Sequence, residues 1–215
     1  MQLESIEFSF LSIFTLITFF IFLMISKYSY KIKDGALLDK DFSKPQAFHR
    51  HAISRSGGAA GIISLNIFFL INFLLYSNIL YEYIFTCNLM FLIGFLDDIK
   101  IKVSPSKRLL LMILSLSFLI HYMPIEILNV DIPFLQEFLK IDIFSSIFVL
   151  LCFLFIINGA NLIDGFNGLL TINLIIINLI LLYINISGGN TEFSIFLIAQ
   201  IVILLSFLLF NFPNA

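Results

Sequence analysis

Seven apolar stretches, each close to 20 residues long, recur along this chain. A helix that crosses a bilayer needs about 20 mostly apolar residues, because each adds 1.5 Å towards a hydrocarbon core about 30 Å thick. The composition, 60% hydrophobic and 12% charged, excludes a soluble globular domain. We therefore predict an all-α, polytopic transmembrane helical bundle that forms a single membrane domain over residues 1–215. The seven predicted helices are Phe8–Ser26, Gly57–Tyr76, Asn78–Leu96, Ser106–Met123, Ile143–Ala160, Leu169–Ile186 and Phe193–Phe210.

The basic residues predict the orientation of this bundle. Eleven of the twelve lysines and arginines lie in two segments, residues 27–55 and 100–108, and only Lys140 lies elsewhere. Loops rich in lysine and arginine stay in the cytoplasm. This places the N-terminus outside and the C-terminus in the cytoplasm. The acidic segment around Asn129–Pro133 is then a small turn or hairpin on the outer surface.

Two adjacent carboxylates, Asp97 and Asp98, end the third predicted helix in the run GFLDDIK. Ionisable residues at the ends of membrane helices are candidates for function. Neighbouring residues of a helix point about 100° apart, so the two carboxylates suit two different roles better than one chelating claw. The alternative is a solvated helix end with no chemical role.

A second polar group lies in the run NGANLIDGFNGLL. Asn158, Asn161 and Asp164 recur at steps of three and form a stripe that would be costly against lipid. The stripe should therefore face a protein interior or a polar cavity. The glycines that flank Asn167, Gly165 and Gly168, allow a sharp turn near a ligand. The alternative is that the asparagines bond between helices and the glycines permit close packing.

A third group lies in the first basic loop, where His49, Arg50, His51 and Arg55 precede the pair Gly57 and Gly58 at a helix start. Imidazole, guanidinium and free backbone N–H groups all suit a phosphate. The alternative is a basic loop that only touches anionic lipid.

In this order the three segments resemble the polyprenyl-phosphate N-acetylhexosamine-1-phosphate transferases of the glycosyltransferase family 4 type. The matching runs are QAFH with RSGG, GFLDD with the later Pro105 and Arg108, and NLIDGFNGL. That superfamily includes enzymes that initiate O-antigen and common-antigen synthesis and the phospho-MurNAc-pentapeptide translocase. The first loop is more similar to the sugar-transferase branch. Ser54 replaces a usual proline, and Asn167 replaces the second aspartate of a DGxDG pattern.

The resemblance implies a reaction and a site. A UDP-activated N-acetylhexosamine 1-phosphate is transferred to polyprenyl (undecaprenyl) phosphate, UMP is released, and a lipid-linked cell-surface polysaccharide is initiated. Catalysis falls to Asp97 and Asp98, and metal binding to Asp98 and Asp164, with Mg²⁺ as the cofactor and Mn²⁺ as the alternative. The implied substrate-binding residues are Asn161, Asp164, Asn167, His49, Arg55, Gly57 and Gly58.

The resemblance also implies a location, partners and a missing part. We expect the bacterial cytoplasmic membrane with a cytoplasmic active face, and the lipid bilayer, polyprenyl phosphate and a UDP-N-acetylhexosamine as partners. No nucleic acid is expected, and a homodimer stays open. Such enzymes continue beyond an Asn-x-Pro-x-Ala segment like Asn211–Ala215 with a Gly-Asp motif and further helices, so we expect an N-terminal fragment. The other functions considered are a membrane transporter and a non-catalytic membrane remnant.

Overall fold

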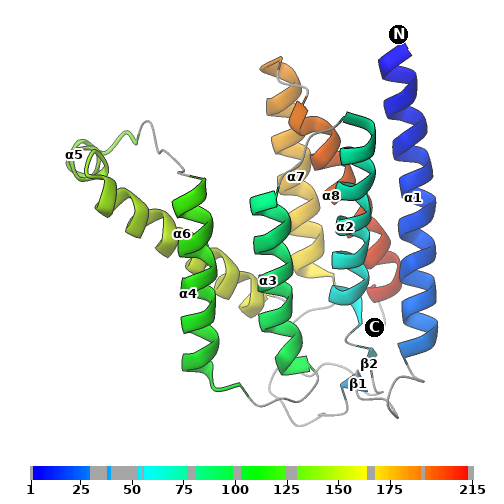
Figure 1. Cartoon of the computed structure of the whole chain (residues 1–215), viewed down its shortest axis with the longest axis horizontal. Helices are drawn as coiled ribbons and strands as arrows, with labels where there is room; N and C mark the ends of the chain where they lie inside the picture. Colours follow the sequence, from blue (N-terminus) through cyan, green and yellow to red (C-terminus); the bar gives the residue numbers. More distant parts are fainter. Residues whose placement is uncertain are drawn as a thin grey trace. The chain divides into compact units, whose positions relative to one another are not determined.

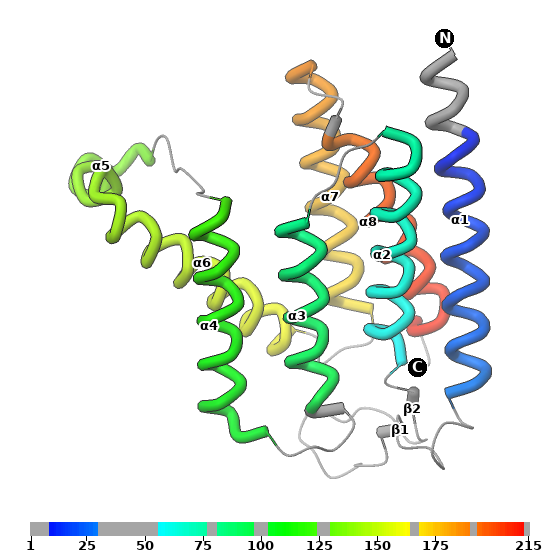
Figure 2. Tube along the Cα trace, viewed as in Figure 1, coloured from blue at the N-terminus to red at the C-terminus, as the bar shows by residue number. Residues whose placement is uncertain are grey.

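The computed structural model describes residues 2–29, 38–39, 53–54, 56–76, 81–98, 103–123, 130–163, 168–189 and 192–212 (Figures 1 and 2). Almost all of these residues are helical, which confirms the all-α class. Two strands of two residues each form one short antiparallel pair, in which Leu38 lies opposite Ser54. The elements are α1 Gln2–Ser29, β1 Leu38–Asp39, β2 Ile53–Ser54, α2 Gly57–Tyr76, α3 Tyr81–Asp98, α4 Pro105–Tyr122, α5 Pro133–Leu139, α6 Asp142–Ile163, α7 Leu169–Ser187 and α8 Glu192–Asn211.

Seven of these helices correspond to the seven predicted ones. Five of them, α1, α2, α6, α7 and α8, are long and apolar enough to cross a membrane. The apolar part of α3 is shorter, Tyr81–Leu96, and α4 carries Lys107 and Arg108 in its first turn. Each of α3 and α4 still has 18 residues, or about 27 Å at 1.5 Å per residue. The chain is a multi-pass membrane protein.

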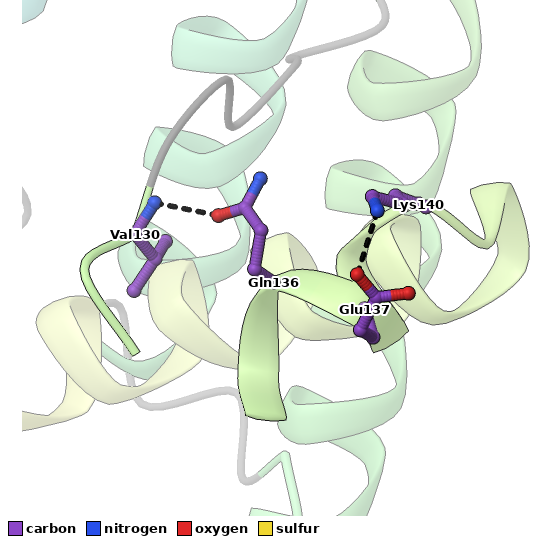
Figure 3. A network of polar contacts seen from close by, with 4 residues as sticks. All are labelled: Val130, Gln136, Glu137 and Lys140. Carbon is purple, nitrogen blue, oxygen red and sulfur yellow. Dashed lines mark hydrogen bonds and ion pairs between the residues drawn. The ribbon is translucent and has the colours of Figure 1, made fainter. Parts of the chain in front are cut away.

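Helix α5 is an element that the sequence analysis missed, because its region was interpreted as a turn or hairpin. Pro133 is its first residue, where a missing backbone N–H costs nothing. The side chain of Gln136 turns back and accepts a hydrogen bond from the Val130 backbone N–H at 2.8 Å (Figure 3). Lys140 Nζ lies 2.7 Å from Glu137 Oε1 on the exposed side (Figure 3). The turn is real, but it leads directly into a short helix.

The described chain divides into two compact units, residues 1–79 with 163–215 and residues 80–162. In the first unit α8 packs against α1, α2 and α7, and α1 also packs against α2. Helices α1 and α8 run in one direction and α2 and α7 in the other (Figure 1). This alternation agrees with the predicted order of crossings. The end of α1, the starts of α2 and α7 and the end of α8 consequently lie at one end of this unit (Figure 1).

Phenylalanine rings fill the interior of the first unit. Phe14 and Phe68 are 0% and 2% exposed, and their ring centroids lie 5.5 Å apart in an edge-to-face arrangement. Phe10 stacks on Phe68 at 5.7 Å, and Phe196 of α8 stacks on Phe69 at 5.7 Å. These contacts join α1, α2 and α8 through aromatic packing, which favours offset and edge-to-face pairs.

The second unit contains α3, α4, α5 and most of α6. Helices α3 and α4 pack against each other and run in opposite directions (Figure 1). The small side chain of Ser115 on α4 is 2% exposed, which lets neighbouring backbones approach closely. The outer side chains of α6 are exposed apolar groups such as Phe155, as expected of a helix in lipid.

Candidate functional site

A cavity of about 540 Å³ lies within the second unit, between α3, α4 and α6. Its wall is largely apolar, built from side chains such as Met90, Met112 and Leu116, which are common in binding pockets for apolar ligands. Its polar lining residues include Arg108, Asn158 and Asn161. The remaining lining residues are Tyr83, Thr86, Cys87, Ile93, Gly94, Leu119, Met123, Phe153 and Ile157.

The lining residues come from both ends of α3 and α4. Gly94 lies one turn before the end of α3, Arg108 lies in the first turn of α4, and Asn161 lies in the last turn of α6. Tyr83 and Met123 lie at the opposite ends of α3 and α4. Gly94 lies eleven residues after Tyr83, or about 17 Å along the helix. The mostly apolar cavity wall therefore has Arg108 and Asn161 at one end and Tyr83 at the other.

The predicted stripe is described for two of its three members. Asn158 and Asn161 both line the cavity, as expected of polar side chains that avoid lipid. The Asn158 side-chain amide donates to the Leu154 carbonyl of the same helix at 2.7 Å. Bonding to its own helix argues against the alternative in which Asn158 joins two helices. Asp164, the third member, lies outside the described residues.

The two predicted catalytic carboxylates belong to the last two residues of α3. The helix ends at Asp98, and the positions of both side chains lie outside the described part of the structure. The C-terminal end of a helix carries partial negative charge from its free carbonyl groups, so anionic side chains there are unfavourable unless cations compensate. Gly94 lines the same end of the cavity as Arg108 and Asn161. Asp97 follows Gly94 by three residues, or about one helical turn. The backbone of the candidate catalytic pair therefore begins next to that end.

Four predicted site residues lie outside the part of the chain that the structure describes: His49, Arg55, Asp164 and Asn167. Their proposed roles therefore stay predictions. Among the residues that the structure describes, no three histidine, cysteine, aspartate or glutamate side chains come together as a metal site. The side chains of the proposed metal ligands Asp98 and Asp164 lie outside the described residues.

Glycines from two of the predicted motifs lie in the first unit. Gly57 and Gly58 are the first two residues of α2, and Gly58 is exposed. A Cβ atom on Gly57 would lie 2.3 Å from Cε2 of Phe207 on α8, so this position admits no side chain without a shift of the ring. Gly168 precedes α7 with φ +80°, a conformation that glycine adopts most readily. Packing accounts for Gly57, whose role in binding substrate stays a prediction.

Two features of the site had not been singled out from the sequence. Arg108 matched the family resemblance without an assigned role, and its place in the cavity wall depends on how α4 packs. Phe207 is one of 27 phenylalanines, and no pattern distinguishes it from the others. A basic residue one turn into an apolar helix was the available signal for Arg108.

Comparison with known proteins identifies the family. The family model described as "Glycosyl transferase family 4" matches residues 80–215, a range that includes GFLDDIK and NLIDGFNGL and excludes the first basic loop. The chain therefore belongs to glycosyl transferase family 4.

Its relatives include phospho-N-acetylmuramoyl-pentapeptide-transferases of Clostridium perfringens. The enzyme of strain 13 is 37% identical over 131 residues, covering 56% of this chain and 41% of the relative, and that of strain SM101 is 35% identical over 131 residues, with 56% and 40% covered. The chain spans about two fifths of the length of these relatives. No solved structure matches it.

Proposed function

We propose that this chain carries part of a phosphotransferase that moves a UDP-activated N-acetylhexosamine 1-phosphate onto polyprenyl phosphate and releases UMP. The product would be the first intermediate of a lipid-linked cell-surface polysaccharide, made on the cytoplasmic face of the bacterial inner membrane. One observation carries the proposal: the cavity of the second unit is mostly apolar, and Arg108 and Asn161 line it close to the end of α3. Family membership supports it.

An acceptor lipid would account for both the apolar and the cationic residues of the cavity wall. A polyprenyl chain is apolar and suits the side chains of Met90, Met112 and Leu116, whereas its phosphate needs a cationic donor. Arg108 supplies N–H donors in a geometry that matches phosphate oxygens. A solute pathway through a transporter would instead need polar groups near the middle of the helices. The residues at mid-helix in this cavity are mostly apolar, which favours a lipid ligand.

The carboxylates supply the chemistry in this proposal. Asp97 removes a proton from the acceptor phosphate or positions it for attack on the sugar-linked phosphorus, and UMP leaves. Asp98 and Asp164 offer oxygen atoms, the donor type that Mg²⁺ prefers, and Mn²⁺ is the alternative ion. When bound, the ion would offset the repulsion between the two phosphate groups. Two carboxylates at the negative end of α3 give an independent reason to expect a cation there.

On the donor side, we propose that Asn161, Asp164 and Asn167 bind the nucleotide sugar. His49, Arg55 and the Gly57–Gly58 helix start would contact phosphate.

The names of the relatives suggest a second candidate for the UDP-sugar that donates the phosphosugar. Those proteins are named for transfer of phospho-N-acetylmuramoyl-pentapeptide, which is also an N-acetylhexosamine derivative. Membranes containing the full-length protein should be supplied with polyprenyl phosphate and either UDP-N-acetylglucosamine or UDP-N-acetylmuramoyl-pentapeptide. Faster UMP release with the first supports the simple hexosamine, and faster release with the second supports the peptide-bearing sugar.

The proposal is tested by Asp97→Asn and Asp164→Asn in the full-length protein. Each substitution keeps the size of the side chain and removes its charge, so UMP release should fall by about 100-fold or more. Glu137→Gln is the control, since this carboxylate lies in the short helix α5 and pairs with Lys140. Near-normal turnover in both aspartate variants would reject the site. Substrate flux across vesicles without UMP release would favour a transporter, and neither activity would favour a non-catalytic remnant.

A further inference from the structure

Glycines from two separate sequence motifs lie against the same end of helix α8. Gly57 begins α2, Gly168 precedes α7, and both lie at the end of the first unit where α8 terminates (Figure 1). A Cβ atom on Gly57 would lie 2.3 Å from Cε2 and 2.9 Å from Cδ2 of Phe207. A Cβ atom on Gly168 would lie 2.9 Å from Cδ1 of Leu208 and 3.1 Å from Cδ2 of Phe212. Real Cβ atoms essentially never approach other atoms closer than 3.0 Å.

Two other glycines show that this closeness is specific. Gly61 lies one turn further along α2 and also faces α8, but its Cβ atom would lie 3.9 Å from Cγ2 of Ile203, an ordinary contact. Gly189 has φ +73°, almost the same backbone conformation as Gly168, and nothing lies within 4 Å of its Cβ position. The tight contacts therefore belong to the two motif glycines and not to every glycine on these helices.

The Phe207 side chain beside Gly57 has ring neighbours of its own, whereas Phe212 beside Gly168 is 54% exposed. The Phe207 ring lies 6.3 Å from the ring of Phe22 on α1, which is 3% exposed. Phe22 also stacks against Phe210 of α8 at 6.3 Å. The Phe207 ring therefore has packed neighbours and does not move aside freely. In a close-packed interior such a ring transmits a displacement instead of absorbing it.

The backbone at each glycine is also fixed by the start of a helix. The Ala60 N–H donates to the Ser56 carbonyl at 3.0 Å in α2, and the Ile172 N–H donates to the Gly168 carbonyl at 2.9 Å in α7. In the sequence, Arg55 stands two residues before Gly57, and Asn167 stands directly before Gly168. The two candidate substrate-binding segments thus each end at a backbone position fixed against α8.

We propose that Phe207, Leu208 and Phe212 are positioning residues that set where these two segments leave the helix bundle. The proposal rests on the function proposed above, because the segments matter as binders of the nucleotide sugar and phosphate. Consecutive residues of a helix point about 100° apart. Phe207 and Leu208 can therefore reach different helices, α2 and α7, from one turn of α8. Side chains at the end of α8 therefore determine the backbone positions of both Gly57 and Gly168.

The first test uses Gly57→Ala in the full-length protein. The added methyl group must displace the Phe207 ring or the start of α2, and kcat for UMP release should fall about tenfold, since small misplacements of binding groups have large effects on rate. Gly61→Ala is the matched control and should leave kcat within about twofold, because its contact distance is ordinary. The double variant Gly57→Ala with Phe207→Leu removes the clashing ring and should recover most of the lost kcat.

The second test compares Gly168→Ala with Gly189→Ala. Both substitutions carry the cost of a positive φ, but only the first also meets Leu208 and Phe212. Gly168→Ala should lower kcat about tenfold or more, and Leu208→Ala added to it should recover part of that loss. Gly189→Ala should lower the thermal midpoint modestly and leave kcat unchanged. Equal kcat effects in the two glycine variants would overturn the role of Leu208 and Phe212.

A merely structural role is distinguished by measuring thermal stability in detergent beside kcat and KM. Recovery of both the thermal midpoint and kcat in the Gly57→Ala, Phe207→Leu double variant supports the proposal. Recovery of the midpoint with no recovery of kcat overturns it. If Gly57→Ala does not fold, Phe207→Leu alone decides: lowered kcat at an unchanged midpoint supports positioning, and an unchanged kcat rejects it. Absence of UMP release from the unmodified protein would reject the proposed function, and the stability measurements would still report whether Phe207 contacts Gly57.

Discussion

The two compact units of this protein use apolar side chains in opposite ways. In the first unit the interior is filled, with Phe14 and Phe68 no more than 2% exposed and their rings in edge-to-face contact. In the second unit apolar side chains of α3, α4 and α6 surround a cavity of about 540 Å³. Protein interiors are normally close-packed, and the size of this cavity falls in the range of ligand pockets, so the proposed function assigns it to the acceptor lipid.

This difference in packing suggests that the two units have different roles. The filled unit fixes backbone positions, including the helix starts that follow Arg55 and Asn167. The open unit offers space with a cation at one end, Arg108. Substitutions in the first unit should therefore act mainly on stability or on geometry. Substitutions in the cavity wall of the second unit should act mainly on the affinity for the acceptor lipid.

The largest effect on stability is expected for Phe68→Ala. Phe68 is 2% exposed, and its ring contacts those of Phe10, Phe14, Phe69 and Phe196. Truncation leaves a cavity that the neighbours fill only in part, at a cost of about 3 kcal/mol. The fraction of monodisperse protein that remains after heating in detergent measures this loss.

The matched control for Phe68→Ala removes the same side chain from an exposed position. Phe155 on α6 is 77% exposed, so Phe155→Ala should change stability by less than about 0.5 kcal/mol. If the two variants were equally stable, the first unit would not depend on its aromatic interior, and the contrast between the units would fail.

The next effect concerns the cavity, which Leu116→Trp should partly fill. Leu116 lines it and is 2% exposed, so a larger side chain at this position takes volume from the ligand. We expect KM for a long-chain polyprenyl phosphate to rise about tenfold, equivalent to about 1.4 kcal/mol of binding. A short-chain acceptor should be affected less, because less of it needs the cavity.

Leu114→Trp is the control for the cavity variant. Leu114 lies on the same helix, is 59% exposed and does not line the cavity. Its substitution should leave both KM values unchanged. Equal increases in KM for long and short acceptors in Leu116→Trp would show that the cavity does not hold the lipid chain.

The sequence predicted the long helices well because a membrane span has a simple physical requirement. The predicted helix Gly57–Tyr76 coincides with α2, and the predicted start of α7 at Leu169 is also correct. Helix α5 escaped because seven residues make too short a run for hydropathy to detect, although Pro133 and the pair Glu137 and Lys140 were local signals.

The site could be predicted from the sequence only for residues whose side-chain type itself suggests a chemical role. Ionisable residues on membrane helices are candidates for function, so Asp97 and Asp98 could be selected from the sequence, and the polar stripe pointed to Asn161. The cavity could not be predicted, because it depends on which faces of α3, α4 and α6 meet. The role of Phe207 was equally hidden, since packing against Gly57 gives no signal in either residue alone.

The smallest effect is expected for two asparagines of α7. The Asn185 side-chain amide of α7 donates to Ser194 Oγ of α8 at 3.2 Å. Asn173 of the same helix donates instead to the Leu169 carbonyl of its own helix at 2.9 Å. Hydrogen bonds between membrane helices contribute about 0.6 kcal/mol on average, so Asn185→Ala should lose about that much stability.

Asn173→Ala tests whether that loss comes from the link between helices. Its donor partner belongs to the same helix, and that carbonyl keeps its place in the helix when the side chain is removed, so stability should hardly change. The pair is measured by thermal unfolding in detergent, together with Asn185→Ala, Ser194→Ala to give the coupling between the two partners. A coupling near zero would mean that this hydrogen bond does not help to join α7 to α8. A coupling above about 1.7 kcal/mol would exceed the largest such bond expected between membrane helices. Asn185 would then rank with Phe68 as a main determinant of stability in the filled unit.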